Sequence, residues 1–209
     1  MPFFKEISLP NDTFIYLWKI NEAISGLEEN LFLNENSLER LSTMKKTSQI
    51  QGFLAVRKLL QTINYTDSDL NYDSFGKPYL KDNKKISISH SNEFACIIIS
   101  NRNVGIDIEL KGEKILNNIL LLFKEDFILS FKGNKEDKVT LTTISWGIKE
   151  ALFKLIPEND ISFKDNISIQ PFEIAQQTAI AEVQINNKTK SFKMYFEGIE
   201  NYTLVYVID

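Results

Sequence analysis

Two carboxylates near the middle of the chain have the spacing of a metal-binding strand. Residues 104–110 read Val-Gly-Ile-Asp-Ile-Glu-Leu, the alternation of a β-strand, in which successive side chains point to opposite faces. Asp107 and Glu109 would share one face, with room beside Gly105, while the apolar residues point into a core. Carboxylate oxygens suit a hard divalent cation. The segment predicts either a cation site or a half-buried strand with a solvated acidic face.

A helical segment further along adds a carboxylate and lysines. Residues 146–154 read Trp-Gly-Ile-Lys-Glu-Ala-Leu-Phe-Lys. Helical periodicity places Trp146, Glu150 and Lys154 on one stripe. An exposed Glu–Lys pair of this kind would contribute only about 0.3–0.5 kcal/mol. The functional alternative makes Glu150 a third metal-binding carboxylate and Lys154 a group that neutralises phosphate charge.

The single histidine and one turn lysine are weak signals when each is taken alone. His90 ends the alternating segment Ile-Ser-Ile-Ser-His at 86–90, and Lys77 lies in a Gly-Lys-Pro turn. A solitary histidine is more often a hydrogen-bonded structural residue than a catalyst. Neither residue identifies a function by itself.

The order and spacing of these segments resemble a known family. The chain has Phe-Gly-Lys-Pro at 75–78, Ile-Ser-His-Ser at 88–91, the acidic strand at 104–110 and Trp-x-x-Lys-Glu at 146–150. This pattern resembles the 4′-phosphopantetheinyl transferases, specifically the long, surfactin-synthetase-type branch. Members of that family transfer the phosphopantetheine arm of coenzyme A to a serine of an apo acyl or peptidyl carrier protein, and they release adenosine 3′,5′-bisphosphate.

The resemblance implies a role for each residue. Mg²⁺ would be held by Asp107, Glu109 and Glu150, and Glu150 is also a candidate base for the serine proton. Lys154 would steady the leaving group, so that Glu150, Lys154 and Asp107 are the catalytic residues. The residues implied to bind coenzyme A are Lys77, Ser89, His90, Lys149, Lys154 and Lys46.

One departure from the family concerns the 3′-phosphate of coenzyme A. Many relatives have an arginine-rich stretch where this chain has Gln-Ile-Gln-Gly at 49–52. Lys45, Lys46 or Arg57 would then have to bind this phosphate.

The elements that must position these residues form two similar halves. We expect an α+β fold in which each half is a long helix packed on a small, mainly antiparallel sheet, related by a pseudo-twofold axis. Residues 1–103 would be the coenzyme A side and 104–209 the metal and carrier-protein side of one functional unit, with the ligand in a cleft between the halves. The expected helices are 37–63, 115–131 and 140–156; the expected strands are 13–20 (at a sheet edge), 86–90, 95–100, 104–110, 168–170, 180–185, 191–197 and 203–208.

Composition excludes several other classes. The chain has 209 residues with 24 basic and 28 acidic side chains, a formal charge of −4, and therefore no global field that would hold nucleic acid. One Cys and one His nearly exclude a zinc site or a Cys–His nucleophile. No apolar run could span a bilayer, and no signal peptide is visible. We expect a cytoplasmic monomer that binds neither nucleic acid nor membrane.

Two alternatives and one docking surface complete the expectations. The chain could be a non-catalytic module that binds coenzyme A or a carrier protein, or another Mg²⁺-dependent phosphotransfer enzyme, although it lacks a Walker-type loop.

Carrier proteins of this family are commonly acidic, so docking would need a local basic patch. Lys45, Lys46, Lys111, Lys114 and Lys124 are candidates. The apolar residues of 115–123 would form a groove beside the last three, unless they belong to the core and the lysines are simply solvated.

Overall fold

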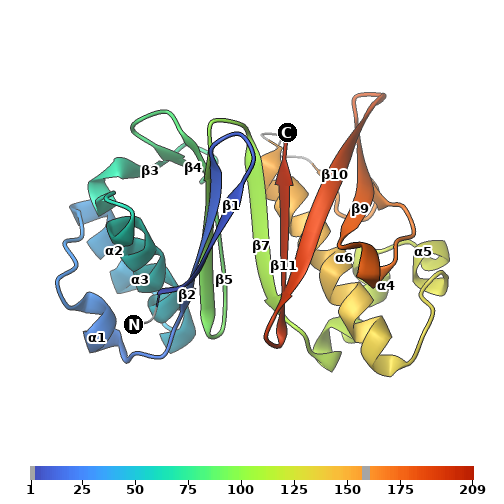
Figure 1. The fold of residues 1–209 in the computed structure, drawn as a ribbon, viewed down its shortest axis with the longest axis horizontal. Helices are drawn as coiled ribbons and strands as arrows, with labels where there is room; N and C mark the ends of the chain where they lie inside the picture. The colour runs from blue at the N-terminus through green and yellow to red at the C-terminus, as the bar shows by residue number, and fades with distance from the viewer. Residues whose placement is uncertain (1–2, 157–160) are drawn as a thin grey trace. The chain divides into compact units, whose positions relative to one another are not determined.

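Contacts within the chain separate it into two units, Met1–Asn103 and Val104–Asp209. The structure is a computed structural model that describes residues 3–156 and 161–209, apart from the side chains of residues 118, 121 and 126. Each unit contains one antiparallel sheet and one long helix (Figure 1), so the predicted α+β class is confirmed. The pseudo-twofold relation between the halves stays a prediction.

The first unit has a sheet with the strand order β1-β2-β6-β5-β4-β3. Its elements in chain order are β1 (Phe3–Leu9), β2 (Thr13–Lys19), α1 (Ile24–Glu28), α2 (Glu35–Thr43), α3 (Thr47–Thr62), η1 (Asp67–Asp69), β3 (Leu70–Tyr72), β4 (Pro78–Leu80), β5 (Lys85–Ser91) and β6 (Phe94–Ser100). Buried residues of α3, such as Leu54, pack with buried residues of β5 and β6, such as Ile86 and Ile97. Strand β2 pairs with both β1 and β6, so the prediction of an edge strand at 13–20 is wrong.

The predicted helix over 37–63 is two helices in the structure. Helix α2 begins where the Asn34 side chain accepts a hydrogen bond from the Ser37 amide at 2.9 Å. The backbone is extended at Met44 and Lys46, with ψ of 132° and 128°. The two helices have different partners: the Ser37 hydroxyl bonds Asp67 at 3.0 Å, whereas α3 packs on the sheet. The chain therefore changes direction between them.

The second unit has a sheet with the strand order β7-β11-β10-β9-β8. Its elements are β7 (Val104–Leu110), η2 (Glu113–Asn118), α4 (Ile119–Leu122), α5 (Glu125–Leu129), α6 (Lys135–Leu155), β8 (Ile167–Ile169), η3 (Ile174–Gln176), β9 (Thr178–Ile185), β10 (Lys188–Ile199) and β11 (Tyr202–Ile208). Asn186 and Asn187 connect β9 to β10 with φ of 50° and 59°, as a two-residue hairpin turn requires. The core surrounds α6, with Ile148 and Leu152 fully buried.

Two predicted helices of this unit have different bounds. Helix α6 begins before residue 140 because Asn134 and Asp137 form a capping box, each side chain accepting a bond from the other's amide. The predicted helix over 115–131 is instead the short segments η2, α4 and α5. This break lets both Ile119 and Ile128 pack against the core around α6, although a straight helix would place them on opposite sides. One straight helix would leave more of this apolar run exposed.

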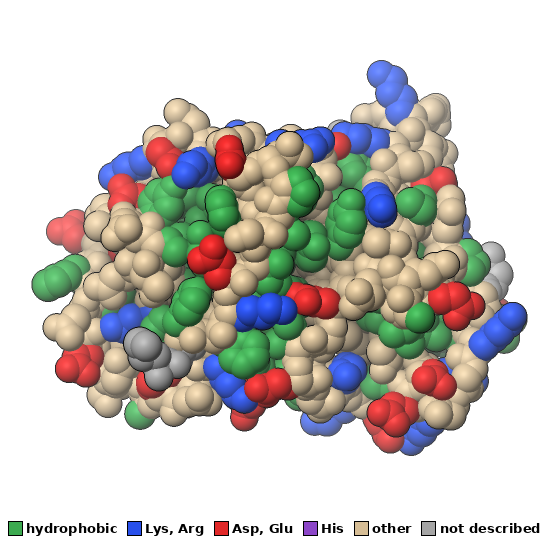
Figure 2. Space-filling view, viewed as in Figure 1, with side chains coloured by type: hydrophobic (Ala, Val, Ile, Leu, Met, Phe, Trp, Pro, Cys, Tyr) green, Lys and Arg blue, Asp and Glu red, His purple; other side chains and the backbone are tan. Residues whose placement is uncertain are grey.

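The surface carries both signs of charge. On the face drawn in Figure 2, basic and acidic side chains are interspersed and do not form a field of a single sign. No helix among the described residues is long and apolar enough to cross a bilayer.

Candidate functional site

Two glycines bring α6 directly against β7. A Cβ on Gly105 would lie 2.0 Å from the carbonyl oxygen of Ala151 in α6. A Cβ on Gly147 would lie 2.7 Å from a methyl group of Val205, which pairs with Asp107 in the sheet. Such distances exclude any side chain at either position without a shift of the helix. The helix therefore covers the face of β7 to which Asp107 belongs.

This arrangement decides how the acidic face of the strand is surrounded. The acidic face is not solvated: Asp107 is 3% exposed and lies on the side of the sheet that α6 covers. Ile106 and Ile108 are fully buried, but they are not part of the apolar cluster around α6. Glu109, nearer the end of the strand, is half-buried. The alternation of the strand and the burial of Ile106 and Ile108 are as predicted, whereas the alternative of a solvated acidic face is wrong for Asp107.

An ion pair links Asp107 to the last turn of α6. The Nζ atom of Lys154 donates to Oδ1 of Asp107 at 2.8 Å and to the carbonyl oxygen of Ile106 at 3.0 Å. The side chain of Lys154 is 25% exposed and that of Asp107 only 4%. The lysine thus presents a cation at the edge of a buried carboxylate.

Glu150 lies within electrostatic range of the same groups. Burial raises the pKa of its carboxyl, Lys154 opposes that rise, and the negative charges of Asp107 and Glu109 add to it. Three carboxylates that repel one another form a site at which a cation would be stabilised. Glu150 therefore lies within electrostatic range of Asp107, Glu109 and Lys154, while the catalytic and metal-binding roles of these residues stay predictions.

The donor set of this cluster suits a hard divalent cation. Its oxygens are carboxylates, and no softer ligand accompanies them. As they stand, no three His, Cys, Asp or Glu side chains among the described residues converge closely enough to hold a metal. Asp107 instead bonds Lys154, so binding of a cation would require these side chains to adjust.

Lys149 points elsewhere. It is 2% exposed, and its Nζ donates to the carbonyl oxygen of Ile167 at 2.8 Å and to that of Phe163. Burial, with a contribution from Lys124, lowers its pKa to about 8 although Asp165 acts in the opposite direction. Its predicted contact with the phosphates of coenzyme A stays a prediction.

Three stacked aromatic rings beside Glu150 were missed by the sequence reasoning. Phe163 stacks on Trp146 at 5.4 Å between ring centroids and on Phe153 at 5.1 Å, with interplanar angles of 21° and 28°. We call these three rings the aromatic ladder. Trp146 and Phe153 are seven residues apart on α6, a spacing that places both on the same side of a helix and could have been recognised in the sequence. Nothing in the sequence indicates that Phe163 packs against them.

In the first unit, His90 lies against the backbone of α3. A Cβ on Gly52 would come within 2.6 Å of the imidazole Cγ, so only glycine leaves room for the ring there. His90 lines a pocket of about 370 Å³. The other lining residues are Arg40, Thr43, Met44, Gln49, Phe53, Val56, Arg57, Tyr72 and Ile88. We call it the α2–α3 pocket.

The remaining residues implied to bind coenzyme A do not line this pocket. Lys77 is half-buried in a turn held by Asp73, whose Oδ1 accepts bonds from the amides of Phe75 and Lys77 at 2.9 Å. Burial is the main cause that lowers the pKa of Lys77. Ser89 is 8% exposed, and Lys46 is exposed at the start of α3.

Two arginines line the α2–α3 pocket: Arg57 is buried, and Arg40 is exposed. Arg57 is 3% exposed, and its Nε bonds Asp67 at 3.0 Å while its guanidinium lies 3.4 Å from the ring centroid of Phe53. It is thus held by the fold. Arg40, which the sequence reasoning missed, lies 4.8 Å from the ring centroid of Tyr72 and is exposed. Its charge faces a pocket that also contains His90.

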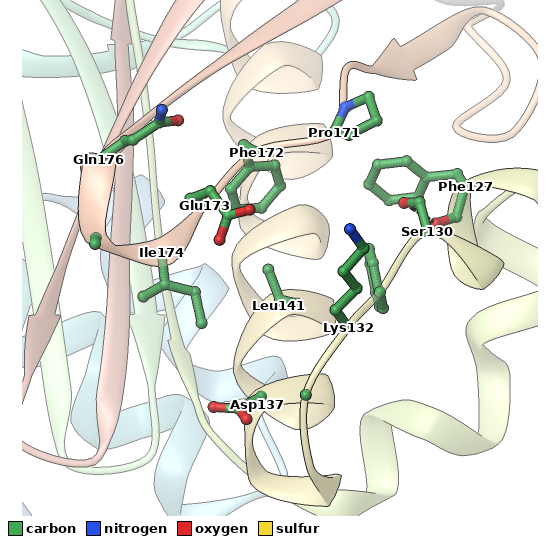
Figure 3. A pocket seen from close by; sticks show the side chains of 13 residues that line it. Phe127, Ser130, Lys132, Asp137, Leu141, Pro171, Phe172, Glu173, Ile174 and Gln176 are labelled. Atoms are coloured by element: carbon green, nitrogen blue, oxygen red, sulfur yellow. Dashed lines mark hydrogen bonds between the residues drawn. The ribbon is translucent and has the colours of Figure 1, made fainter.

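A larger pocket, of about 530 Å³, lies in the second unit. Figure 3 shows Leu141 and Asp137 on α6, Phe172 on the segment before β9, and Phe127 and Lys132 on the opposite wall. No residue predicted to act in catalysis or binding lines it.

The fold and the site together define an α+β protein with a carboxylate–lysine cluster in one unit and an arginine–histidine pocket in the other. The chain is similar to the 4′-phosphopantetheinyl transferase gsp of Aneurinibacillus migulanus, with 28% identity over 155 residues that cover 70% of this chain. The match spans 63% of the length of that relative. No protein-family model matches the chain. The similarity confirms the resemblance to 4′-phosphopantetheinyl transferases that the motifs predicted.

Proposed function

We propose that the protein transfers the 4′-phosphopantetheine group of coenzyme A to a serine of an apo acyl or peptidyl carrier protein. The observation that carries this proposal is the cluster of Asp107, Glu109, Glu150 and Lys154, assembled by β7 and α6. The similarity to a phosphopantetheinyl transferase supports the same reaction.

In this reaction the serine oxygen attacks the phosphorus atom that bears the pantetheine arm. A P–O bond to the nucleotide breaks, and adenosine 3′,5′-bisphosphate leaves. Glu150 is the proposed acceptor of the serine proton. Lys154 neutralises charge on the leaving phosphate, which is the main demand of phosphoryl transfer on a protein.

Asp107, Glu109 and Glu150 would hold Mg²⁺. Once bound there, the ion would supply charge neutralisation and orientation of the pyrophosphate oxygens. The chemistry of the three carboxylates and their mutual repulsion support this assignment.

The first unit would bind the nucleotide of coenzyme A. The α2–α3 pocket offers Arg40 and His90 for phosphate and the rings of Phe53 and Tyr72 for contact with a base. Arg40 is then the residue that takes the place of the missing arginine-rich stretch. Lys77, Ser89 and Lys46 are further proposed contacts.

Intact-mass analysis of an apo carrier protein tests the proposal. After incubation with coenzyme A, Mg²⁺ and the protein, we expect the mass to rise by one phosphopantetheine group, and Glu150→Gln or removal of Mg²⁺ with EDTA should prevent the rise. Binding of coenzyme A without any change of mass, across fatty-acid, polyketide and peptide-synthetase carriers, would instead identify a non-catalytic binding module.

A further inference from the structure

We infer that Lys149 is a positioning residue: its buried ammonium ties the turn at 163–167 to α6 and so holds the aromatic ladder beside Glu150. The inference deepens the proposed function and rests on it, because Glu150 is taken as part of the reacting site. It differs from the role implied by the sequence, in which Lys149 binds phosphate.

The contacts of Lys149 are those of a tether. Its Nζ donates to the carbonyl oxygens of Phe163 and Ile167, and it lies 5.0 Å from the ring centroid of Phe123. A buried ammonium is costly unless hydrogen bonds compensate it. Both bonds go to backbone atoms of one short segment, which joins that segment to α6 at two points four residues apart.

The tethered segment is stiff by itself. The Ser162 amide donates to Asn166 Oδ1 at 2.8 Å, and the Ser162 hydroxyl donates to Asp165 Oδ2 at 2.8 Å. These bonds close the turn with its own side chains, as Ser and Asn residues commonly do. Fixing its two ends therefore fixes the ring of Phe163, which stacks between Trp146 and Phe153.

Helical geometry separates the tether from the carboxylate cluster. With about 100° of rotation per residue, Lys149 and Lys154 lie about 140° apart around α6, and Trp146 and Phe153 lie between Lys149 and Glu150. The ladder thus forms the side of α6 next to Glu150. In this position it forms part of the surroundings of Glu150, which is half-buried.

Lys149→Met tests the tether, with Lys138→Met as the control. Methionine keeps an unbranched side chain, one atom shorter than that of lysine, but cannot donate to the two carbonyl oxygens. Lys138 is an exposed lysine of the same helix. We expect faster amide hydrogen exchange at 161–169 in free Lys149→Met, together with a changed emission of Trp146, while the first unit and Lys138→Met exchange as the wild type does. Unchanged exchange and emission in Lys149→Met would overturn the tether.

The kinetic consequence is tested separately. Because misplacement of a reacting group costs about tenfold to a hundredfold in rate, we expect kcat of Lys149→Met to fall by that factor, with KM for coenzyme A within about twofold. Phe163→Leu, which removes the middle ring but keeps both carbonyl acceptors, should reproduce the fall in kcat.

A rise in KM for coenzyme A of about tenfold or more with normal kcat would show a phosphate ligand and contradict the inference. If the wild type modifies no carrier protein, the proposed function fails. Hydrogen exchange and tryptophan emission still decide whether Lys149 is the tether.

Discussion

Asp107 shows how one residue can serve both the fold and the chemistry. It is almost fully buried between β7 and α6, yet it bonds a lysine that is a quarter exposed. A buried carboxylate needs a partner of opposite charge. Because Lys154 is partly exposed, a charged ligand can reach this ion pair from solvent. Neighbouring Glu109 and Glu150 keep the site negative, which favours a divalent cation over a second lysine.

The first prediction concerns Asp107→Asn. Titration of the wild type with Mg²⁺ should raise its melting temperature, because a ligand that binds only the folded state stabilises it. Loss of a direct ligand should weaken that effect at least about tenfold, since loss of a supporting contact alone costs that much. Glu113→Gln, an exposed carboxyl in the same unit, is the control and should titrate like the wild type. Equal stabilisation of both variants would remove Asp107 from the metal site.

A second prediction concerns the contact between Gly52 and His90. Gly52→Ala places a methyl group against the imidazole and should move the ring. We expect Gly52→Ala and His90→Ala each to raise KM for coenzyme A with little change in kcat, the sign of uniform binding. In the double variant the effects should not add, because both act through one side chain.

Gly26→Ala is the matched control, since a Cβ there meets Glu22 only at 3.4 Å. Its KM should equal that of the wild type. Additive effects of Gly52→Ala and His90→Ala would show that the glycine acts independently of the imidazole.

Local periodicity predicted which residues share a face, the family resemblance joined the two segments into one site, and the partners of single residues were not predicted. Asp107 and Glu150 were found from the strand alternation and the helical stripe, because a face is set by spacing alone. The destinations of Lys149 and Arg57 were not predictable, because their partners Ile167 and Asp67 are 18 and 10 residues away and come close only through tertiary packing. Phe163 was missed for the same reason.

Between elements, the contact of α6 with β7 decides whether the site forms. Gly105 and Gly147 permit an approach that no other residue would allow. The sequence showed Gly105 as space for a ligand, but the structure fills that space with the backbone of Ala151. The observed helix bounds differ from the predicted ones for two reasons. Asn134 caps α6 and so begins it before residue 140, and the predicted helix over 37–63 is divided because α2 and α3 pack against different partners.

A third prediction follows for Gly105→Ala. Its Cβ would meet a backbone oxygen, which cannot rotate away, so we expect a loss of about 1–3 kcal/mol or more in the free energy of unfolding. Transfer activity should fall as well, because α6 carries Glu150 and Lys154. Gly198→Ala in β10 has open space around the new methyl group and should leave both quantities close to the wild type. Chemical denaturation measures the difference. Equal stability of the two variants would contradict the close approach.

At the scale of the whole molecule, the distribution of charge governs the docking of a carrier protein. The chain has a formal charge of −4, and both signs are interspersed on the face drawn in Figure 2. An acidic carrier would be repelled at long range and attracted only by a local patch. Part of the expected apolar groove belongs to the core: Phe123 is 2% exposed and Ile119 packs against it, whereas Leu120 is 61% exposed. The apolar part of the predicted surface is thus reduced to the neighbourhood of Leu120, while Lys45, Lys46, Lys111, Lys114 and Lys124 stay candidates for the basic patch.

The last prediction compares two charge reversals of equal size. Lys111→Glu with Lys114→Glu, and Lys81→Glu with Lys84→Glu in the first unit, each change the charge by −4 and give a formal charge of −8. If docking depends on the local patch, the first pair should raise KM for the carrier protein far more than the second, and neither should change KM for coenzyme A. Added salt should weaken carrier use by the wild type, because it screens charges beyond about 10 Å at 0.1 M, and should weaken it less in the Lys111/Lys114 variant. Equal rises in KM for the carrier in both variants would show that net charge, and not this surface, controls docking.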